Sequence, residues 1–406
     1  MSTVRERVRH FLPWLLTASM VEWIGTGVFV TASTVYFVRF IGLTPTSVGV
    51  GLSLAGAVAL LAAVPLGALS DAWGTRRVLI LINVCRAAAT LCYPLVGEWW
   101  GFLGLTTIVI VTETAAIPLT QAAVGERTTE ETRTTVMGAQ RTVLNIGMSI
   151  GGLIAAAAVA TGSEVVYHWL FVADALTFGV AALLLSRLAP VPGRAGAKRP
   201  SRLAVFRDRR LLAIACYDAV LTLWLPILNV ALPVWLATRT DAPVGLFGVL
   251  YAVNTITCVL LQVPVSARIR SIMDSWRSYA ASGVFLATAC ACFAIAPLAR
   301  GTGTVVLLAL SVLATTAGEL CQVSAAWTLS FNLAPPAERA QYLSGFGLGR
   351  AAATRLIGPV LLTGAVIALG PAGWVLLAAV FAGATVIAVV VRRRVAHTGP
   401  VPKSSE

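Results

Sequence analysis

The sequence predicts an all-α membrane protein in which twelve transmembrane helices form two pseudo-symmetric six-helix bundles. Of its 406 residues, 58% are hydrophobic and only 12% are charged. A soluble protein of average composition has about 25% charged residues, so the composition argues against a soluble fold. The apolar residues also fall in repeated blocks of about 20, which is the helix length needed to cross the hydrocarbon of a bilayer.

Hydropathy and charge together define the expected spans. Several of the outer connections have only a few residues, so the helices that they join should be antiparallel neighbours. Val64 and Pro65 recur 199 positions later as Val263 and Pro264, which indicates duplicated halves. We expect the spans at residues 12–38, 46–68, 78–97, 101–124, 137–161, 167–187, 211–237, 244–266, 278–298, 303–333, 342–369 and 371–391.

Basic residues, which give the chain a net charge of +13, gather in every second loop. The intervening loops contain almost none, namely Arg39, Arg239 and Arg300. This positive-inside pattern predicts cytoplasmic termini and a multi-pass protein of the bacterial plasma membrane, and it argues against nucleic acid as a partner. The charged N-terminus leads directly into a span without a small-residue cleavage site, so we expect it to be retained.

A stretch rich in proline, glycine and arginine divides the chain near its middle. It has no apolar periodicity, which is typical of a cytoplasmic linker. The expected organisation is an N-terminal bundle at 12–187, the basic linker at 188–210, a C-terminal bundle at 211–391 and a cytoplasmic tail at 392–406.

The sequence GALSDAWGTRR, at residues 67–77, interrupts two long apolar runs. Asp71 and the two arginines that follow it could not lie in lipid unpaired, so this stretch belongs at a membrane face. The glycines at its start and middle permit a tight reversal of the chain.

This stretch resembles the loop between helices 2 and 3 of the major facilitator superfamily, whose pattern combines glycines, an aspartate and basic residues. The resemblance implies the twelve-helix fold of that family. It also implies that the aspartate interacts with the opposing half near helix 11 and favours the outward-facing state. The residues that would therefore have a gating role are Gly67, Asp71, Gly74, Arg76 and Arg77.

The fifth span resembles the glycine-rich helix 5 of proton-driven drug exporters. It contains Gly147, Gly151 and Gly152 but no proline, and a Gly-Pro step appears in the eleventh span instead, at Gly358 and Pro359. The resemblance of the fifth span, together with a likeness of the sixth span to macrolide-efflux exporters, implies the drug:proton antiporter branch of the family. Close helix packing at these small residues is a sufficient alternative explanation.

Ionisable residues inside spans each cost about 2.5 to 3.5 kcal/mol on insertion scales, so each needs a partner, water or a function. This chain has eight, namely Glu22, Arg86, Glu113, Asp174, Asp218, Glu319, Arg350 and Arg355. Four of the acids fall on helices 1, 4, 7 and 10, which line the central cavity in the family that the chain resembles. We therefore expect proton coupling at Glu22, Glu113, Asp218 and Glu319.

Structural ion pairs are the alternative for two of these acids. Glu113 lies at a depth similar to that of Arg86 on the adjacent helix, and Glu319 lies within reach of Arg355 on helix 11. Asp174, near the outer end of helix 6, we interpret as structural.

Polar and aromatic residues at helical spacing lie on or beside the acidic faces. A cavity lined by rings, methyl groups and carboxylates suits a bulky amphipathic or cationic compound, although ordinary helix packing explains any single ring equally well. The expected substrate-binding residues are Trp23, Thr26, Tyr36, Trp224, Asn229, Gln322 and Trp327.

Motifs for other chemistry are missing from the sequence. It has no GxxxxGK[ST] phosphate loop, no catalytic Ser/His/Asp spacing and no metal-ligand spacing among its 7 cysteines and 3 histidines. We therefore expect no enzyme activity, no cofactor and no metal.

The predicted function is secondary active export of small amphipathic drugs or natural products by proton antiport with alternating access. The expected partners are a small-molecule substrate, protons and the lipid bilayer, and the protein should be a monomer. The alternatives are a proton-coupled or facilitative importer of a small metabolite, or a sensor or lipid-translocating protein of the same fold.

Overall fold

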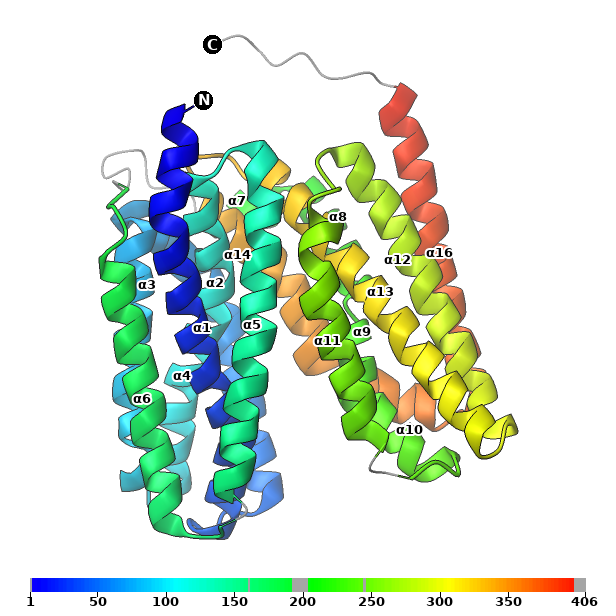
Figure 1. Cartoon of the computed structure of the whole chain (residues 1–406), viewed down its shortest axis with the longest axis horizontal. Coiled ribbons are helices and arrows are strands. Elements are labelled where there is room, and N and C mark those ends of the chain that lie inside the picture. Colours follow the sequence, from blue (N-terminus) through cyan, green and yellow to red (C-terminus); the bar gives the residue numbers. More distant parts are fainter. Residues whose placement is uncertain (1, 160, 192–203, 244–245, 398–406) are drawn as a thin grey trace. The chain divides into compact units, whose positions relative to one another are not determined.

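The computed structural model describes residues 2–159, 161–191, 204–243 and 246–397. Most of the predicted linker and the end of the predicted tail, residues 192–203 and 398–406, lie outside this part of the chain. The described residues form helices, turns and short loops, and they contain no strand. The chain divides into two compact units (Figure 1).

The first unit contains residues 1–212 and 333–351. Helix α1 packs against α5 and α6, α3 packs against α4 and α6, and α2 packs against α4. Its helices are α1 (Ser2–Arg39), α2 (Pro45–Trp73), α3 (Thr75–Leu91), the 3-10 turn η1 (Tyr93–Leu95), α4 (Trp99–Arg127), α5 (Glu130–Val159), α6 (Glu164–Ser186), α7 (Ala204–Arg207) and nearly all of α14 (Arg339–Ala352).

The second unit contains residues 213–332 and 352–406. Helices α12 and α16 run side by side over much of their length (Figure 1). The helices of this unit are most of α8 (Arg209–Leu221), α9 (Trp224–Pro226), η2 (Ile227–Ala231), α10 (Leu232–Arg239), α11 (Leu246–Ser266), α12 (Ile272–Ile295), η3 (Ala296–Leu298), nearly all of α13 (Thr302–Leu333), η4 (Ala353–Ile357), α15 (Gly358–Leu361), η5 (Leu362–Ile367) and α16 (Pro371–His397).

Eleven helical segments in the described part of the chain are long and apolar enough to cross a membrane. The remaining predicted span, residues 342–369, is also helical, but π-helical turns at η4 and η5 divide it into short pieces. Pro359 has no N–H group to donate, which interrupts the α-helical ladder at this point. A Cβ atom on Gly358 would lie 2.5 Å from the Pro226 ring, so only glycine fits this close approach.

Small residues allow α1 and α5 to touch through their backbones. A Cβ atom on Gly147 would lie 2.8 Å from the Cβ of Trp23, and one on Gly151 would lie 2.0 Å from the carbonyl oxygen of Ile24. Gly152 faces a more open space, because its nearest neighbour would be 3.6 Å away. The small-residue spacing of α5 thus sets the distance between these two helices.

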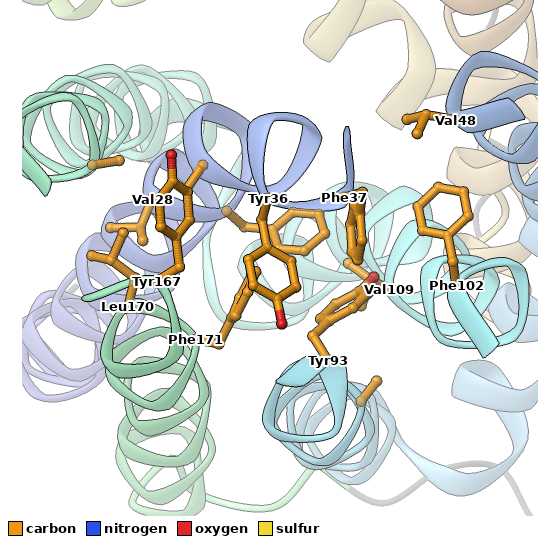
Figure 2. Packing of buried hydrophobic residues seen from close by; sticks show 14 residues of the cluster. Val28, Tyr36, Phe37, Val48, Tyr93, Phe102, Val109, Tyr167, Leu170 and Phe171 are labelled. Carbon is orange, nitrogen blue, oxygen red and sulfur yellow. The ribbon is translucent and has the colours of Figure 1, made fainter. Parts of the chain in front are cut away.

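An aromatic cluster fills the end of the first unit at which α1, η1, α4 and α6 meet (Figure 2). The ring centroids of Tyr36 and Phe171 are 4.9 Å apart, and those of Phe37 and Phe102 are 4.6 Å apart. These rings are buried, and edge-to-face packing adds to the energy of their burial. The cluster therefore closes this end of the bundle.

We predict that Gly151→Ala destabilises the protein more than Gly152→Ala does. The first substitution forces α1 and α5 apart at the Ile24 carbonyl, and overpacking of this kind costs about 1 to 3 kcal/mol. The second adds a methyl group where the nearest atom lies 3.6 Å away. Thermal unfolding of both variants in detergent measures the difference, and equal melting temperatures would contradict the close contact.

Candidate functional site

A buried ion pair joins α1 and α3 inside the first unit. The Nη1 atom of Arg86 donates to Oε1 of Glu22 at 2.7 Å, and the two side chains are only 2% and 7% exposed. Nη2 of Arg86 donates to the hydroxyl of Thr26 at 3.0 Å. The guanidinium also stacks on the Phe178 ring of α6, 4.1 Å from its centroid. One cation thus connects three helices at membrane depth.

This ion pair corrects one alternative from the sequence, in which Arg86 forms a structural ion pair with Glu113. The guanidinium points toward α1, and its ion pair is with Glu22. Glu113 on α4 lies within electrostatic range of Glu22 and takes part in an interaction of its own. The structure therefore brings two of the predicted proton-coupling acids close together.

Asp174 of α6 belongs to the same region. Its side chain lies against α1, because a Cβ atom on Gly25 would be 2.3 Å from Oδ1 of Asp174. Asp174 is also within electrostatic range of Arg86. We call Glu22, Thr26, Arg86, Asp174 and Phe178 the Arg86 cluster.

In the second unit, Asp218 lies in a network of neutral hydrogen-bond donors. Its Oδ1 atom accepts from the Tyr279 hydroxyl at 2.8 Å and from Nε2 of Gln322 at 2.5 Å. Oε1 of Gln322 accepts in turn from the Trp224 indole at 3.0 Å, and its amide reaches the Thr222 hydroxyl at 3.2 Å. We call these five residues the Asp218 network, and all of them are buried.

Three predicted site residues, Asp218, Trp224 and Gln322, therefore meet in one place. Tyr279 is a member that the sequence analysis missed, because an uncharged tyrosine in a span gives no signal that distinguishes it from a packing residue. Its hydroxyl nevertheless donates to Oδ1 of the buried Asp218 carboxylate.

Glu319 lies one turn before Gln322 on α13 and has a separate donor. Nδ2 of Asn254, on α11, donates to Oε2 of Glu319 at 3.1 Å and reaches the Thr316 hydroxyl at 2.9 Å. Both Glu319 and Asn254 are buried. Asn254 was also missed from sequence, although a polar amide within a predicted span is a weak signal of such a role.

The other predicted substrate-binding residues lie in different surroundings. Tyr36 belongs to the aromatic cluster, where its hydroxyl is 3.1 Å from Nε2 of His168. Trp23 is partly exposed beside α5, and Trp327 is buried within the second unit. Asn229, in the π-helical turn η2, is exposed.

The loop that resembles the family motif binds the start of α14. Oδ1 of Asp71 accepts from the backbone N–H of Ala340 at 3.0 Å, and Oδ2 accepts from that of Gln341 at 2.9 Å. First-turn N–H groups have no partner within their helix, and the helix dipole favours a negative charge there. A Cβ atom on Gly67 would lie 2.7 Å from Oγ of Ser344, so the two helices are in close contact beside this cap.

The remaining loop residues connect the ends of neighbouring helices. Gly74 has a φ of +92°, which lets one residue separate α2 from α3 and which glycine adopts without strain. Arg76 donates to the carbonyl oxygen of Ser186 at the end of α6. Arg77 is exposed, and Arg339 of α14 reaches the Gly125 carbonyl on α4 at 2.9 Å.

These features define a polytopic α-helical membrane protein with buried charges inside each unit. Residues 15–359 match the family model of the Major Facilitator Superfamily. The chain therefore belongs to the major facilitator superfamily and is a secondary transporter of small molecules across a lipid bilayer. The predicted fold class and the predicted superfamily are confirmed.

Solved structures of this superfamily share the fold across almost the whole chain. The outward-facing transporter FucP has a TM-score of 0.74 at 12% identity, over 93% of this chain and 98% of that one. The human organic anion transporter MFSD10 has a TM-score of 0.70 at 15% identity, over 95% and 99%. The proton:xylose symporter XylE has a TM-score of 0.68 at 12% identity, over 96% of each chain. No curated protein sequence gives a significant match.

We predict that Asp71→Asn loosens the start of α14. The amide keeps one acceptor oxygen but turns an N–H₂ group toward a backbone N–H, so one hydrogen bond and the favourable charge are lost, at a cost of about 1 to 2 kcal/mol. Hydrogen exchange of a peptide that contains Ala340 and Gln341 measures this effect, with faster exchange expected. Arg77→Gln, at an exposed position of the same loop, is the control. Unchanged exchange in Asp71→Asn would contradict the cap.

Proposed function

We propose that this transporter exports small amphipathic compounds, drugs or natural products, by proton antiport with alternating access. The proposal rests mainly on the buried acids of both units, because a carboxylate inside a membrane protein needs a functional or structural reason. Glu22 lies in the Arg86 cluster, Asp218 and Glu319 each accept hydrogen bonds from neutral donors, and Glu113 lies near Glu22. All four remain the proposed proton-coupling residues.

The Asp218 network suggests how cargo and proton would compete. Gln322 donates to Asp218 and accepts from Trp224, so a cargo that takes over either hydrogen bond changes the surroundings of the carboxylate. A cationic cargo that comes to lie beside the carboxylate favours its ionised form and so displaces a proton from it. Cargo binding and proton binding at Asp218 would then be linked.

We propose Trp224 and Gln322 as the substrate-binding residues that this geometry favours most. Trp23, Thr26, Tyr36, Asn229 and Trp327 complete the proposed set. Rings beside carboxylates suit a cationic amphipathic cargo, since the ring face attracts a cation.

We propose a gating role for the loop formed by Gly67, Asp71, Gly74, Arg76 and Arg77. Asp71 caps α14, and α14 precedes the interrupted span at η4, α15 and η5. Release of this cap would free the start of that span to move. The close contacts of Gly147, Gly151 and Gly358 support the proposed helix-packing role, in which we also include Gly152 and Pro359.

The organisation of the chain in the cell is also part of the proposal. It comprises two six-helix halves at 12–187 and 211–391, a cytoplasmic linker at 188–210 and a cytoplasmic tail at 392–406. The protein would act as a monomer in the bacterial plasma membrane, with both termini in the cytoplasm.

The decisive experiment is cargo-driven proton movement in proteoliposomes that contain a trapped pH dye. A panel of amphipathic cations is added, and we expect at least one to move protons in the direction opposite to its own transport. Movement of both in the same direction would instead identify a proton-coupled importer, and cargo transport without any pH change would identify a facilitator.

We predict that Glu22→Gln and Glu319→Gln each abolish concentrative transport while cargo binding is retained, because a permanently neutral amide cannot exchange a proton. Asp241→Asn is the matched control. Asp241 is exposed and lies between two candidate spans. The N–H of Gly301 donates to it at 2.9 Å and lowers the pKa of its carboxyl, so it is ionised at neutral pH. If both Gln variants still concentrate cargo, the assigned proton mechanism is wrong.

A further inference from the structure

We propose that Asp174 binds a proton in the interior of the first unit, at a site that it shares with Glu22 through Arg86. The inference rests on the proposed proton antiport and names a site for the proton that is exchanged. Asp174 lies outside the four acids assigned to coupling above, and its position in the sequence suggests only a structural acid.

The first observation is the lack of a hydrogen-bond donor for the Asp174 carboxyl. The residue is 1% exposed, and neither Oδ1 nor Oδ2 has a hydrogen-bond partner among the described residues. The Thr177 hydroxyl lies close enough to act on the carboxyl, but its well-formed hydrogen bond is to the backbone carbonyl of Asp174 at 2.7 Å, so it supports the carboxylate only weakly. An ionised carboxylate without donors is far more costly to bury than a neutral carboxyl. Protonation removes that cost.

The second observation is the charge balance of the Arg86 cluster. It contains one cation and two acids, and the cation is turned toward α1, with Nη1 on Glu22 and Nη2 on Thr26. One proton on Asp174 makes the cluster neutral. Without that proton the cluster has a net charge of −1 in an interior where an uncompensated charge is strongly disfavoured.

The third observation is how close Arg86 lies to Asp174. Phe178, on which the guanidinium stacks, is one helical turn after Asp174 on α6. Nε of Arg86 has no hydrogen-bond partner in the described part of the chain. If Asp174 loses its proton, the guanidinium is therefore positioned to divide its charge between Glu22 and Asp174.

Gly25 shapes the site from the side of α1. A Cβ atom there would lie 2.3 Å from Oδ1 of Asp174 and 2.0 Å from Oγ1 of Thr177. Only glycine leaves room for the carboxyl at this helix contact. Asp174 thus lies at the junction of α1 and α6, where a change in helix spacing acts on it directly.

The other ionisable groups around Asp174 come from the helices packed against α6 and from α4. The Tyr93 hydroxyl of η1 lies within electrostatic range of Asp174 and is 3.1 Å from the Thr106 hydroxyl. Glu113 of α4 acts on Glu22 and on Tyr93. Arg141 of α5 lies six residues before Gly147, which is roughly 9 Å along the helix axis from that contact with α1. Arg141 also takes part in another interaction. Arg86 is the cation whose contacts with Glu22 and Phe178 place it beside Asp174.

The exchange step balances in charge. The Asp174 O–H bond breaks, the proton leaves to water, and the electron pair stays on the carboxylate, so the cluster changes from neutral to −1. Binding of a singly charged cationic cargo restores neutrality. The site therefore matches an exchange of one proton for one cationic cargo molecule.

Infrared spectroscopy of the reconstituted protein tests this inference through the C=O stretch of protonated carboxyl groups. At neutral pH we expect a protonated-carboxyl band that disappears in Asp174→Asn and persists in the control Asp241→Asn. In Glu22→Gln the Arg86 charge is left to Asp174 alone, so we expect the band to weaken there as well. A band of full intensity in Asp174→Asn would overturn the assignment. Should Asp174→Asn fail to fold, Asp174→Glu replaces it: a shift in band frequency supports the proposal, and an unshifted band contradicts it.

Proton flux in the same variants separates this inference from the proposed function. Loss of the band together with loss of cargo-driven proton movement in Asp174→Asn supports the coupling role. Loss of the band with unchanged proton movement overturns that role. If the band is lost in Asp174→Asn but the wild type moves no protons with any compound, the antiport proposal fails, while the proton site at Asp174 is supported.

Discussion

The ion pair of Arg86 and Glu22 is the interaction on which the arrangement of the first unit depends. An arginine inside a bundle needs compensation of its charge, and this one obtains it from Glu22 at 2.7 Å, from the Thr26 hydroxyl and from the Phe178 ring. Because these partners lie on α1 and α6, the position of the guanidinium fixes three helices relative to one another. Any change in the protonation of this region must therefore act on helix packing.

Buried acids occur in both units, with different hydrogen-bond donors beside them. Glu22 accepts from the Arg86 guanidinium, and the interactions of Asp218 and Glu319 include hydrogen bonds from the neutral groups of Tyr279, Gln322 and Asn254. The donors around a buried carboxylate stabilise its charged form, so a change at any one of these hydrogen bonds acts on the charge of the acid that accepts it.

Spans and motifs could be predicted because they follow from composition and local spacing. The loop at residues 67–77 and the depth of Glu22 are visible in the sequence, since charges interrupt or enter apolar runs. The partner of Arg86 could not be predicted, because Glu22 and Glu113 lie at similar depth and helix rotation has no local signal. The roles of Asn254 and Tyr279 could not be predicted for the same reason. The surroundings of the Asp174 carboxyl depend entirely on tertiary packing.

The central claim is that Arg86 and Glu22 compensate each other inside the membrane. The most direct test is a double-mutant cycle on the stability of the purified protein, with Arg86→Met, Glu22→Gln and the double variant. We expect Arg86→Met to cost about 3 to 5 kcal/mol, since it leaves a buried acid without its cation, and the double variant to recover a large part of that loss. Additive effects of the two substitutions would show that the residues do not interact, which would contradict this account.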